Sequence, residues 1–398
     1  MYLFKYNVPG NLYLFILIGV MLLSKSFAYL KAPGTPIYII DFVMLAIVFL
    51  YLQRSNGFLL PKLLRPVLII VLFSSIHLII SLLKDGINID SVRDYMAFFY
   101  PIFSLVCYNI LSYNNKRLLG VGLAFFIIIF HVFFIFTGFN LPVPWFDSLY
   151  YIKRGDLAVI LSICFLSIMA FGKNKVFKVL SAFLAMFLFI DIYSVNRAGT
   201  LSFIIATTLY YYFKKGPIII LVLIPLLLLM IILIGTFINL GGGGVATVAW
   251  RILLWKTAII ETFNHGFLLG IGFGEALTSV IGFYDANLNR NPHNYFITVF
   301  FRLGLVGLAV YSFLLINVFW AAKNAIYNHT ISNYNSKYRD GLIILLSVFM
   351  GALFNSCFDV YLENPYGAII FWTILGSLVY WINISKRKVG FNQYALAK

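Results

Sequence analysis

Charged residues are scarce in this chain: only 11% of its 398 residues are Asp, Glu, Lys or Arg, whereas 62% are hydrophobic. Soluble domains contain roughly a quarter charged residues, so a soluble fold would lack the polar surface needed to enclose this much apolar surface. Apolar stretches of about twenty residues, separated by short polar breaks, instead run from Asn11 to Ile384. Each stretch can satisfy its own backbone hydrogen bonds in lipid as a helix. The composition therefore predicts an all-α integral membrane protein in which residues 1–398 form a single polytopic membrane domain.

Cysteine and acidic residues are also few. The three cysteines, Cys107, Cys164 and Cys357, lie in apolar runs, where cysteine usually packs as a small hydrophobic side chain, so we expect no disulfide framework. The chain has 13 acidic against 29 basic residues, a formal net charge of +16. Because no basic face or aromatic-basic platform accompanies this charge, we predict no nucleic-acid partner and ascribe the charge to membrane topology.

Hydropathy predicts about twelve transmembrane helices. Their expected ranges are 11–30, 37–52, 67–84, 95–112, 118–138, 155–172, 177–193, 199–213, 217–240, 296–322, 341–357 and 365–384. The sequence has no internal repeat at a fixed period and no pair of matching interrupted helices of the kind found in inverted-repeat transporters. A transporter or flippase of lipid-linked sugars is therefore the less favoured alternative.

Lysine and arginine concentrate in alternate connections between these helices. They are Arg54, Lys62, Arg65, Lys116, Arg117, Lys173, Lys175, Lys178, Lys214, Lys215, Lys323, Lys337, Arg339, Lys386, Arg387 and Lys388. The positive-inside rule places these connections and both termini in the cytoplasm. The one long connection, residues 241–295 between the ninth and tenth helices, then lies on the external side. Loops of this length are usually functional.

Three arginines of the external segments are candidates for binding an anion. Arg197 follows a very short turn and precedes two small residues, which would hold it at the membrane surface. Arg251 and Trp255 lie in a predicted amphipathic helix, residues 250–263, within the long loop. A guanidinium offers a rigid fork of donors and stays charged, so Arg197 and Arg251 are candidate anion clamps. Arg154, at another external helix start, is a candidate contact to phosphate or glycan, with an interfacial anchor as the alternative.

Glycines follow this amphipathic helix. Gly270, Gly272 and Gly274 alternate with apolar residues, a spacing that allows a tight turn with close approach of the backbone to a ligand. No strand-helix-strand pattern surrounds them, which excludes a dinucleotide-binding fingerprint.

A histidine stands directly before the tenth helix, in the segment Pro292-His293-Asn294-Tyr295. Proline and asparagine suit a helix start, so His293 would be held at a defined height near the external interface. Histidine accepts a proton near neutral pH, and we therefore predict His293 as a general base. The other histidines are interpreted as structural; they are His77, His131, His265 and His329.

Clustered carboxylates are limited to one external connection, which contains Asp85, Asp90 and Asp94. A hard divalent cation needs several oxygen ligands together. We interpret these three as a solvated loop and predict no metal site. Asp359 and Glu363, in the last external turn, are candidates for orienting the arginines.

In this order and topology, the external segments resemble those of the Wzy-type O-antigen polymerases and the related O-antigen ligases. The resemblance rests on Arg197-Ala198-Gly199, Arg251 to Trp255, Gly270-Ile271-Gly272-Phe273-Gly274, Pro292-His293-Asn294-Tyr295 and Gly304-Leu305-Val306-Gly307-Leu308. By motif it covers residues 190–320, and by helix number and loop placement it covers the whole chain. One departure is Arg302, which stands before Gly304 where relatives often have an acidic or neutral residue.

The resemblance implies a glycan donor on undecaprenyl pyrophosphate and an acceptor sugar hydroxyl, joined at the periplasmic face of the bacterial inner membrane. Negative charge grows on the leaving pyrophosphate as the glycosidic bond breaks, so Arg197 and Arg251 would stabilise the transition state. His293 would take the proton of the attacking hydroxyl in an inverting displacement that needs no metal or other cofactor. The candidate substrate contacts are Arg154, Asn294, Tyr295, Trp255, Gly272 and Gly274.

The resemblance leaves the acceptor open. A polymerase joins repeat units to one another, whereas a ligase moves the finished chain onto the lipid A core, and the two share these motifs. We favour the polymerase because no segment looks specialised for a lipid core acceptor. The expected partners are the lipid-linked oligosaccharide, membrane lipid and a chain-length regulator protein.

Overall fold

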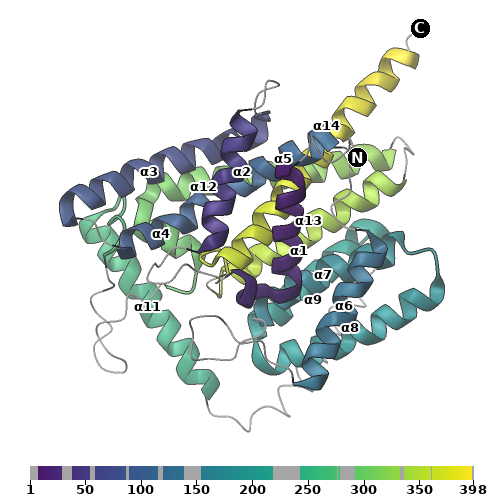
Figure 1. The fold of residues 1–398 in the computed structure, drawn as a ribbon, viewed down its shortest axis with the longest axis horizontal. Helices are drawn as coiled ribbons and strands as arrows, with labels where there is room; N and C mark the ends of the chain where they lie inside the picture. The colour runs from purple at the N-terminus through teal and green to yellow at the C-terminus, as the bar shows by residue number, and fades with distance from the viewer. Residues whose placement is uncertain are drawn as a thin grey trace.

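The computed structural model describes residues 8–28, 38–53, 59–86, 89–114, 120–138, 154–217, 243–275, 277, 292–331, 336–359 and 361–396. These residues form α-helices, with one short 3-10 helix, η1 (Lys62–Leu64), and no strand among them (Figure 1). The α-helices are α1 (Val8–Ala28), α2 (Ile39–Leu52), α3 (Arg65–Asp85), α4 (Ile89–Phe99), α5 (Ile102–Asn114), α6 (Val121–Thr137), α7 (Arg154–Phe171), α8 (Lys175–Val195), α9 (Arg197–Lys215), α11 (Gly243–His265), α12 (Tyr295–Ile331), α13 (Ser336–Ser356) and α14 (Pro365–Leu396). The helix predicted at 217–240 lies outside the described residues.

Within the described residues, six helical segments are long and apolar enough to cross a membrane. They are Lys62–Lys84, Asp90–Ser112, Lys175–Val195, Tyr295–Asn328, Lys337–Ser356 and Pro365–Ser385. Four shorter apolar helices accompany them: Pro9–Leu23, Ile39–Leu50, Val121–Thr137 and Gly155–Phe171. The fold is thus that of an α-helical membrane protein, as composition predicts.

Two predicted helices are interrupted in the structure, and the range 296–322 is broken at Gly304 of α12. The expected span 95–112 is interrupted at Tyr100 and Pro101, so that α4 ends at Phe99 and α5 begins at Ile102. Proline has no N–H to donate to the preceding turn and disfavours helical geometry in the residue before it. The interruption leaves α4 as a separate segment whose first turns carry Asp90, Arg93 and Asp94.

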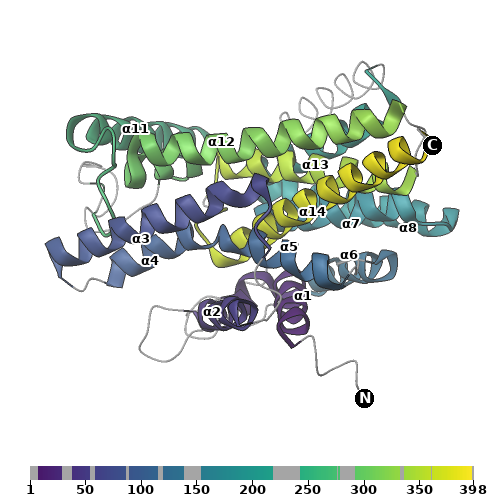
Figure 2. The ribbon, with the colours of Figure 1, turned by 90° about the horizontal axis from the view of Figure 1, so that it is seen from above.

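The helices pack in layers around α5 and α14, most of whose residues are buried. Figure 2 shows α1 and α2 on one side of these helices and α11 on the opposite side. Small residues permit the closest helix contacts. A Cβ added at Gly376 of α14 would overlap the Ser104 carbonyl of α5, and one at Gly351 of α13 would lie 2.6 Å from the Ser202 carbonyl of α9.

The bundle has two chemically different ends. At one end, which we call the lysine end, Lys214 of α9 forms an ion pair of 3.3 Å with Asp340 of α13. At the other, which we call the site end, Asn196 before α9 donates to Asp359 after α13. Helices α4, α7, α9, α12 and α14 all begin at the site end, which contains the candidate residues.

Candidate active site

The turn between α13 and α14 connects predicted site segments that are far apart in sequence. The Asp359 carboxylate accepts a hydrogen bond of 3.2 Å from Asn196 Nδ2. Asn196 also caps α9, whose first residue is the exposed Arg197. The ring of Phe358 packs against that of Trp255 in α11, with centroids 6.2 Å apart. This turn therefore contacts both arginine-bearing helices, α9 and α11.

His293 lies beside two tryptophans of α11. Trp255 Nε1 donates a hydrogen bond of 2.6 Å to the Pro292 carbonyl, and the Trp250 ring stands edge-on to the imidazole with centroids 5.4 Å apart. His293 is half-buried and has a φ of 56°, in the left-handed region. Few non-glycine residues adopt this conformation, and those that do cluster at functional sites. The structure thus brings His293 and the Arg251 segment together.

The two residues after His293 stabilise the start of α12. Asn294 Oδ1 accepts hydrogen bonds from the N–H groups of Phe296 and Ile297, at 3.1 and 3.3 Å, as a helix cap. Tyr295 is 1% exposed and donates its hydroxyl proton to the Tyr311 hydroxyl at 2.9 Å. The structure therefore places Tyr295 in the core, and a substrate contact of either residue stays a prediction.

Arg251 is half-buried, and its Nε atom is buried without an acceptor among the residues described. A buried donor that lacks a partner is energetically costly.

Arg154 is the first residue of α7. The carbonyl of the next residue, Gly155, accepts a hydrogen bond of 3.2 Å from Asn355 Nδ2 of α13. Arg154 therefore begins its helix at the site end.

The loop after α11, residues 266–275, is here called the glycine loop, and it packs into a break in α12. This helix is interrupted at Gly304, where φ is 64° and ψ is −163°. The Ile271 N–H donates to the Phe301 carbonyl at 2.8 Å, and the two N–H groups after Gly304 donate to loop carbonyls. Gly270, with φ 80°, comes so close that a Cβ there would overlap the backbone of α12. The close backbone approach expected of these glycines is thus made to the protein's own helix.

Arg302 binds the second half of the glycine loop through hydrogen bonds to its backbone. It is 2% exposed, and its Nη1 donates to the carbonyls of Gly272 at 3.1 Å and Glu275 at 2.8 Å. The Gly274 N–H donates to the Asp94 carboxylate at 3.1 Å. Gly272 and Gly274 have φ values of 96° and 84°, which favour glycine. Their contact with substrate stays a prediction.

The interpretation of Asp94 as part of a solvated loop is wrong. Its carboxylate forms an ion pair of 2.7 Å with Arg302 Nη2, and the two side chains are only 12% and 3% exposed. Burial is possible because each charge has the other as partner. Asp90, one turn earlier, is exposed.

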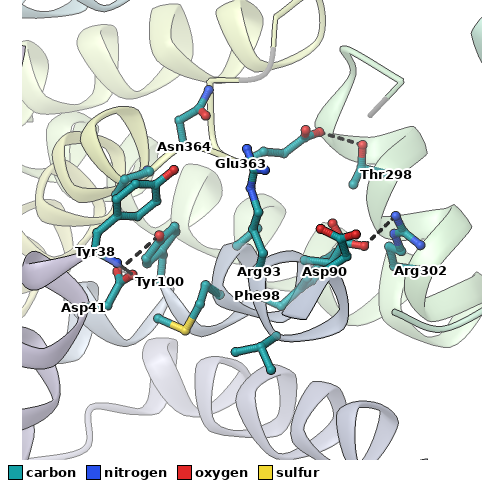
Figure 3. A pocket seen from close by; sticks show the side chains of 15 residues that line it. Tyr38, Asp41, Asp90, Arg93, Phe98, Tyr100, Thr298, Arg302, Glu363 and Asn364 are labelled. Carbon is teal, nitrogen blue, oxygen red and sulfur yellow. Dashed lines mark hydrogen bonds and ion pairs between the residues drawn. The ribbon is translucent and has the colours of Figure 1, made fainter. Parts of the chain in front are cut away.

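A polar cavity of about 100 Å³ lies beside this ion pair, between the starts of α2, α4, α12 and α14 (Figure 3). Its polar lining consists of Tyr38, Asp41, Asp90, Arg93, Asp94, Tyr100, Thr298, Arg302, Glu363 and Asn364. Asp41 is 2% exposed and accepts hydrogen bonds from the Tyr38 N–H at 3.2 Å and the Tyr100 hydroxyl at 3.3 Å. Thr298 Oγ1 donates to Glu363 Oε1 at 2.6 Å.

The cavity residues Asp41, Arg93 and Thr298 are not predicted from the sequence. A usable signal exists for Asp41, because a lone carboxylate in an apolar helix is costly and usually functional.

Tyr361, between α13 and α14, is fully buried. Burial raises the pKa of its hydroxyl well above the usual value, and the charge of Asp156 raises this pKa further. Its hydroxyl therefore stays protonated.

Within the described part of the chain, no three His, Cys, Asp or Glu side chains are placed to hold a metal ion.

No protein-family model matches this chain, and no curated protein matches it.

Proposed function

We propose that the protein is a membrane glycosyltransferase that polymerises lipid-linked repeat units of a surface polysaccharide such as O-antigen. It would transfer the growing glycan from undecaprenyl pyrophosphate to a hydroxyl of an acceptor sugar. The proposal includes about twelve transmembrane helices, cytoplasmic termini and an external site end in the bacterial inner membrane. The resemblance of the motifs supports the reaction, and the structure supports the grouping of the residues.

The left-handed conformation of His293 is the observation that most supports this proposal. A strained residue persists only where its surroundings impose it, and here the tryptophans Trp250 and Trp255 contact the ring and the preceding carbonyl. Such packing limits the motion of the imidazole, which is what a general base needs in order to meet a hydroxyl in one geometry.

Arg251 is the second support. It follows Trp250 in α11, and its buried Nε lacks an acceptor in the described structure. A pyrophosphate oxygen would supply that acceptor, with exposed Arg197 at the start of α9 as the second cation.

In the proposed step the acceptor oxygen attacks the anomeric carbon of the donor. The bond from that carbon to the pyrophosphate oxygen breaks, and undecaprenyl pyrophosphate leaves with the electron pair. His293 takes the hydroxyl proton, while the arginines stabilise the charge that develops on the leaving group.

The test uses purified protein in lipid nanodiscs, supplied with lipid-linked repeat units extracted from the producing cells. We expect His293→Gln to insert normally and bind donor, yet to lose about two to four orders of magnitude in rate. His265→Gln is the matched control, because His265 is exposed at the end of α11, the helix whose tryptophans contact the His293 segment.

Near-normal turnover by His293→Gln would eliminate the base assignment. Loss of donor binding would instead move His293 to the pyrophosphate. If native protein makes no polymer but transfers glycan to added lipid A core, the protein is a ligase.

A further inference from the structure

The cavity of Figure 3 has the shape and chemistry of a binding site with a different preference from the arginine site. Its volume of about 100 Å³ has room for several water-sized groups. Four carboxylates line it, from Asp41, Asp90, Asp94 and Glu363, against two guanidinium groups, from Arg93 and Arg302. Because Arg302 is already paired with Asp94, Arg93 is the guanidinium group of this lining that can serve a ligand.

Arg93 gives this cavity a donor for a ligand. Its side chain is exposed on α4 and extends from the helix toward Glu363 (Figure 3). Arg93 makes no ion pair with any residue of the described structure. Together with the acceptor oxygens of Asp41 and Glu363 and the amide of Asn364, it offers both donors and acceptors. A polyhydroxyl ligand needs this mixture, since each hydroxyl both donates and accepts.

Helix α12 connects the cavity to the segment of the proposed base. Thr298, in the cavity wall, donates its N–H to the Asn294 carbonyl at 2.9 Å. Asn294 directly follows His293. Four residues of helix correspond to about 6 Å along the axis, so Thr298 lies about one helical turn from the residue that directly follows His293.

We propose that this cavity binds the acceptor glycan, a neutral or amino sugar, while the arginines bind the donor pyrophosphate. The proposal rests on the proposed function, and it assigns the two substrates to two sides of His293. Arg93 would act by donating hydrogen bonds to acceptor hydroxyls, and the carboxylates would accept hydrogen bonds from them.

Equilibrium binding tests this assignment without relying on turnover. The probe is the lipid-free repeat-unit oligosaccharide released from the cells' own polysaccharide, measured by calorimetry on protein in nanodiscs. We expect Arg93→Gln to weaken binding of this oligosaccharide at least about tenfold, because a charge-assisted hydrogen bond is lost, and to leave donor binding unchanged. Lys84→Gln is the matched control, since Lys84 is an exposed cation at the site end but outside the cavity lining.

Native affinity in Arg93→Gln would overturn the proposal, as would the absence of oligosaccharide binding to the native protein. Asp41→Asn provides a second variant with nearly unchanged shape, and it should also weaken oligosaccharide binding. If native protein binds the oligosaccharide through Arg93 but forms no glycosidic bond, the acceptor site stands and the proposed polymerase function fails.

Discussion

Two ion pairs near the glycine loop differ in their surroundings and therefore in their value to the fold. Arg302 and Asp94 lie 2.7 Å apart with side chains only 3% and 12% exposed. Lys84 and Glu275 lie 2.9 Å apart with side chains 66% and 37% exposed. Water screens the Lys84–Glu275 pair, which therefore contributes little to the free energy of unfolding. Removing one partner of the Arg302–Asp94 pair would instead leave a buried charge without its counter-ion.

We expect Arg302→Met to lower the free energy of unfolding by about 3–5 kcal/mol, because Asp94 is left buried without its cation. Lys84→Met should lower it by about 0–1 kcal/mol. Denaturant unfolding of both variants in detergent micelles compares them directly. Similar small losses in the two variants would show that Arg302 is dispensable to the fold.

The sequence alone could not reveal this pair. Arg302 is conspicuous as a charged residue in an apolar run, but nothing in its neighbourhood points to Asp94, which lies on a helix far away in the chain. Asp94 stands in an acidic segment that favours a solvated interpretation. Only packing of α4 beside α12 brings the two charges together.

At the scale of elements, the break in α12 organises the site end. A helix interrupted at Gly304 exposes backbone groups, and the glycine loop satisfies them with hydrogen bonds in both directions. The same loop connects α11 to the Arg302 and Asp94 pair. The positions of Trp250 and Trp255 beside His293 therefore depend on this loop.

Gly270→Ala should be strongly destabilising, because φ is 80° there and the added Cβ would overlap the α12 backbone. We expect a loss of more than about 1 kcal/mol in the free energy of unfolding. We also expect faster proteolysis of the loop after α11. Gly122→Ala in α6 is the control, since a Cβ there meets no atom within 4 Å. Equal stability of the two variants would contradict the insertion of the loop into α12.

Most helices could be predicted because each is a single apolar run with polar ends. The expected range 177–193, for example, corresponds to α8 at Lys175–Val195. The interruptions could not be predicted in the same way, because hydropathy is continuous across Tyr100 and Gly304. Pro101 is a local signal for the first. Nothing local distinguishes Gly304 from a glycine tolerated within a membrane helix.

At the scale of the whole molecule, the two ends of the bundle have opposite chemistry. The lysine end pairs Lys214 with Asp340, and Arg339 donates to the Phe213 carbonyl at 3.1 Å. The site end contains the buried carboxylates, the tryptophans and the glycine loop. The positive-inside rule orients such a molecule with its lysine end in the cytoplasm, which would place the site end on the external face.

Cysteine labelling tests this orientation. The native cysteines are first replaced, which is feasible because Cys107 and Cys164 are small buried side chains and Cys357 is half-buried. Single cysteines are then introduced at Glu275, Lys215 and Lys337, of which the two lysines are exposed and Glu275 is 37% exposed in its side chain. A membrane-impermeant maleimide should label Glu275→Cys in intact spheroplasts. It should label Lys215→Cys and Lys337→Cys only in inside-out vesicles.

Each alternative outcome of this labelling has a distinct meaning. If the pattern is reversed, the antiparallel fold stands but the site end faces the cytoplasm, and transfer from an externally presented undecaprenyl donor is ruled out. If all three cysteines react from one face, then α9 and α13 do not span the bilayer between the lysine end and the site end. The expected pattern alone brings His293, Arg197 and Arg251 to the external face together, because all three lie in segments tied to the turn between α13 and α14 or to α11.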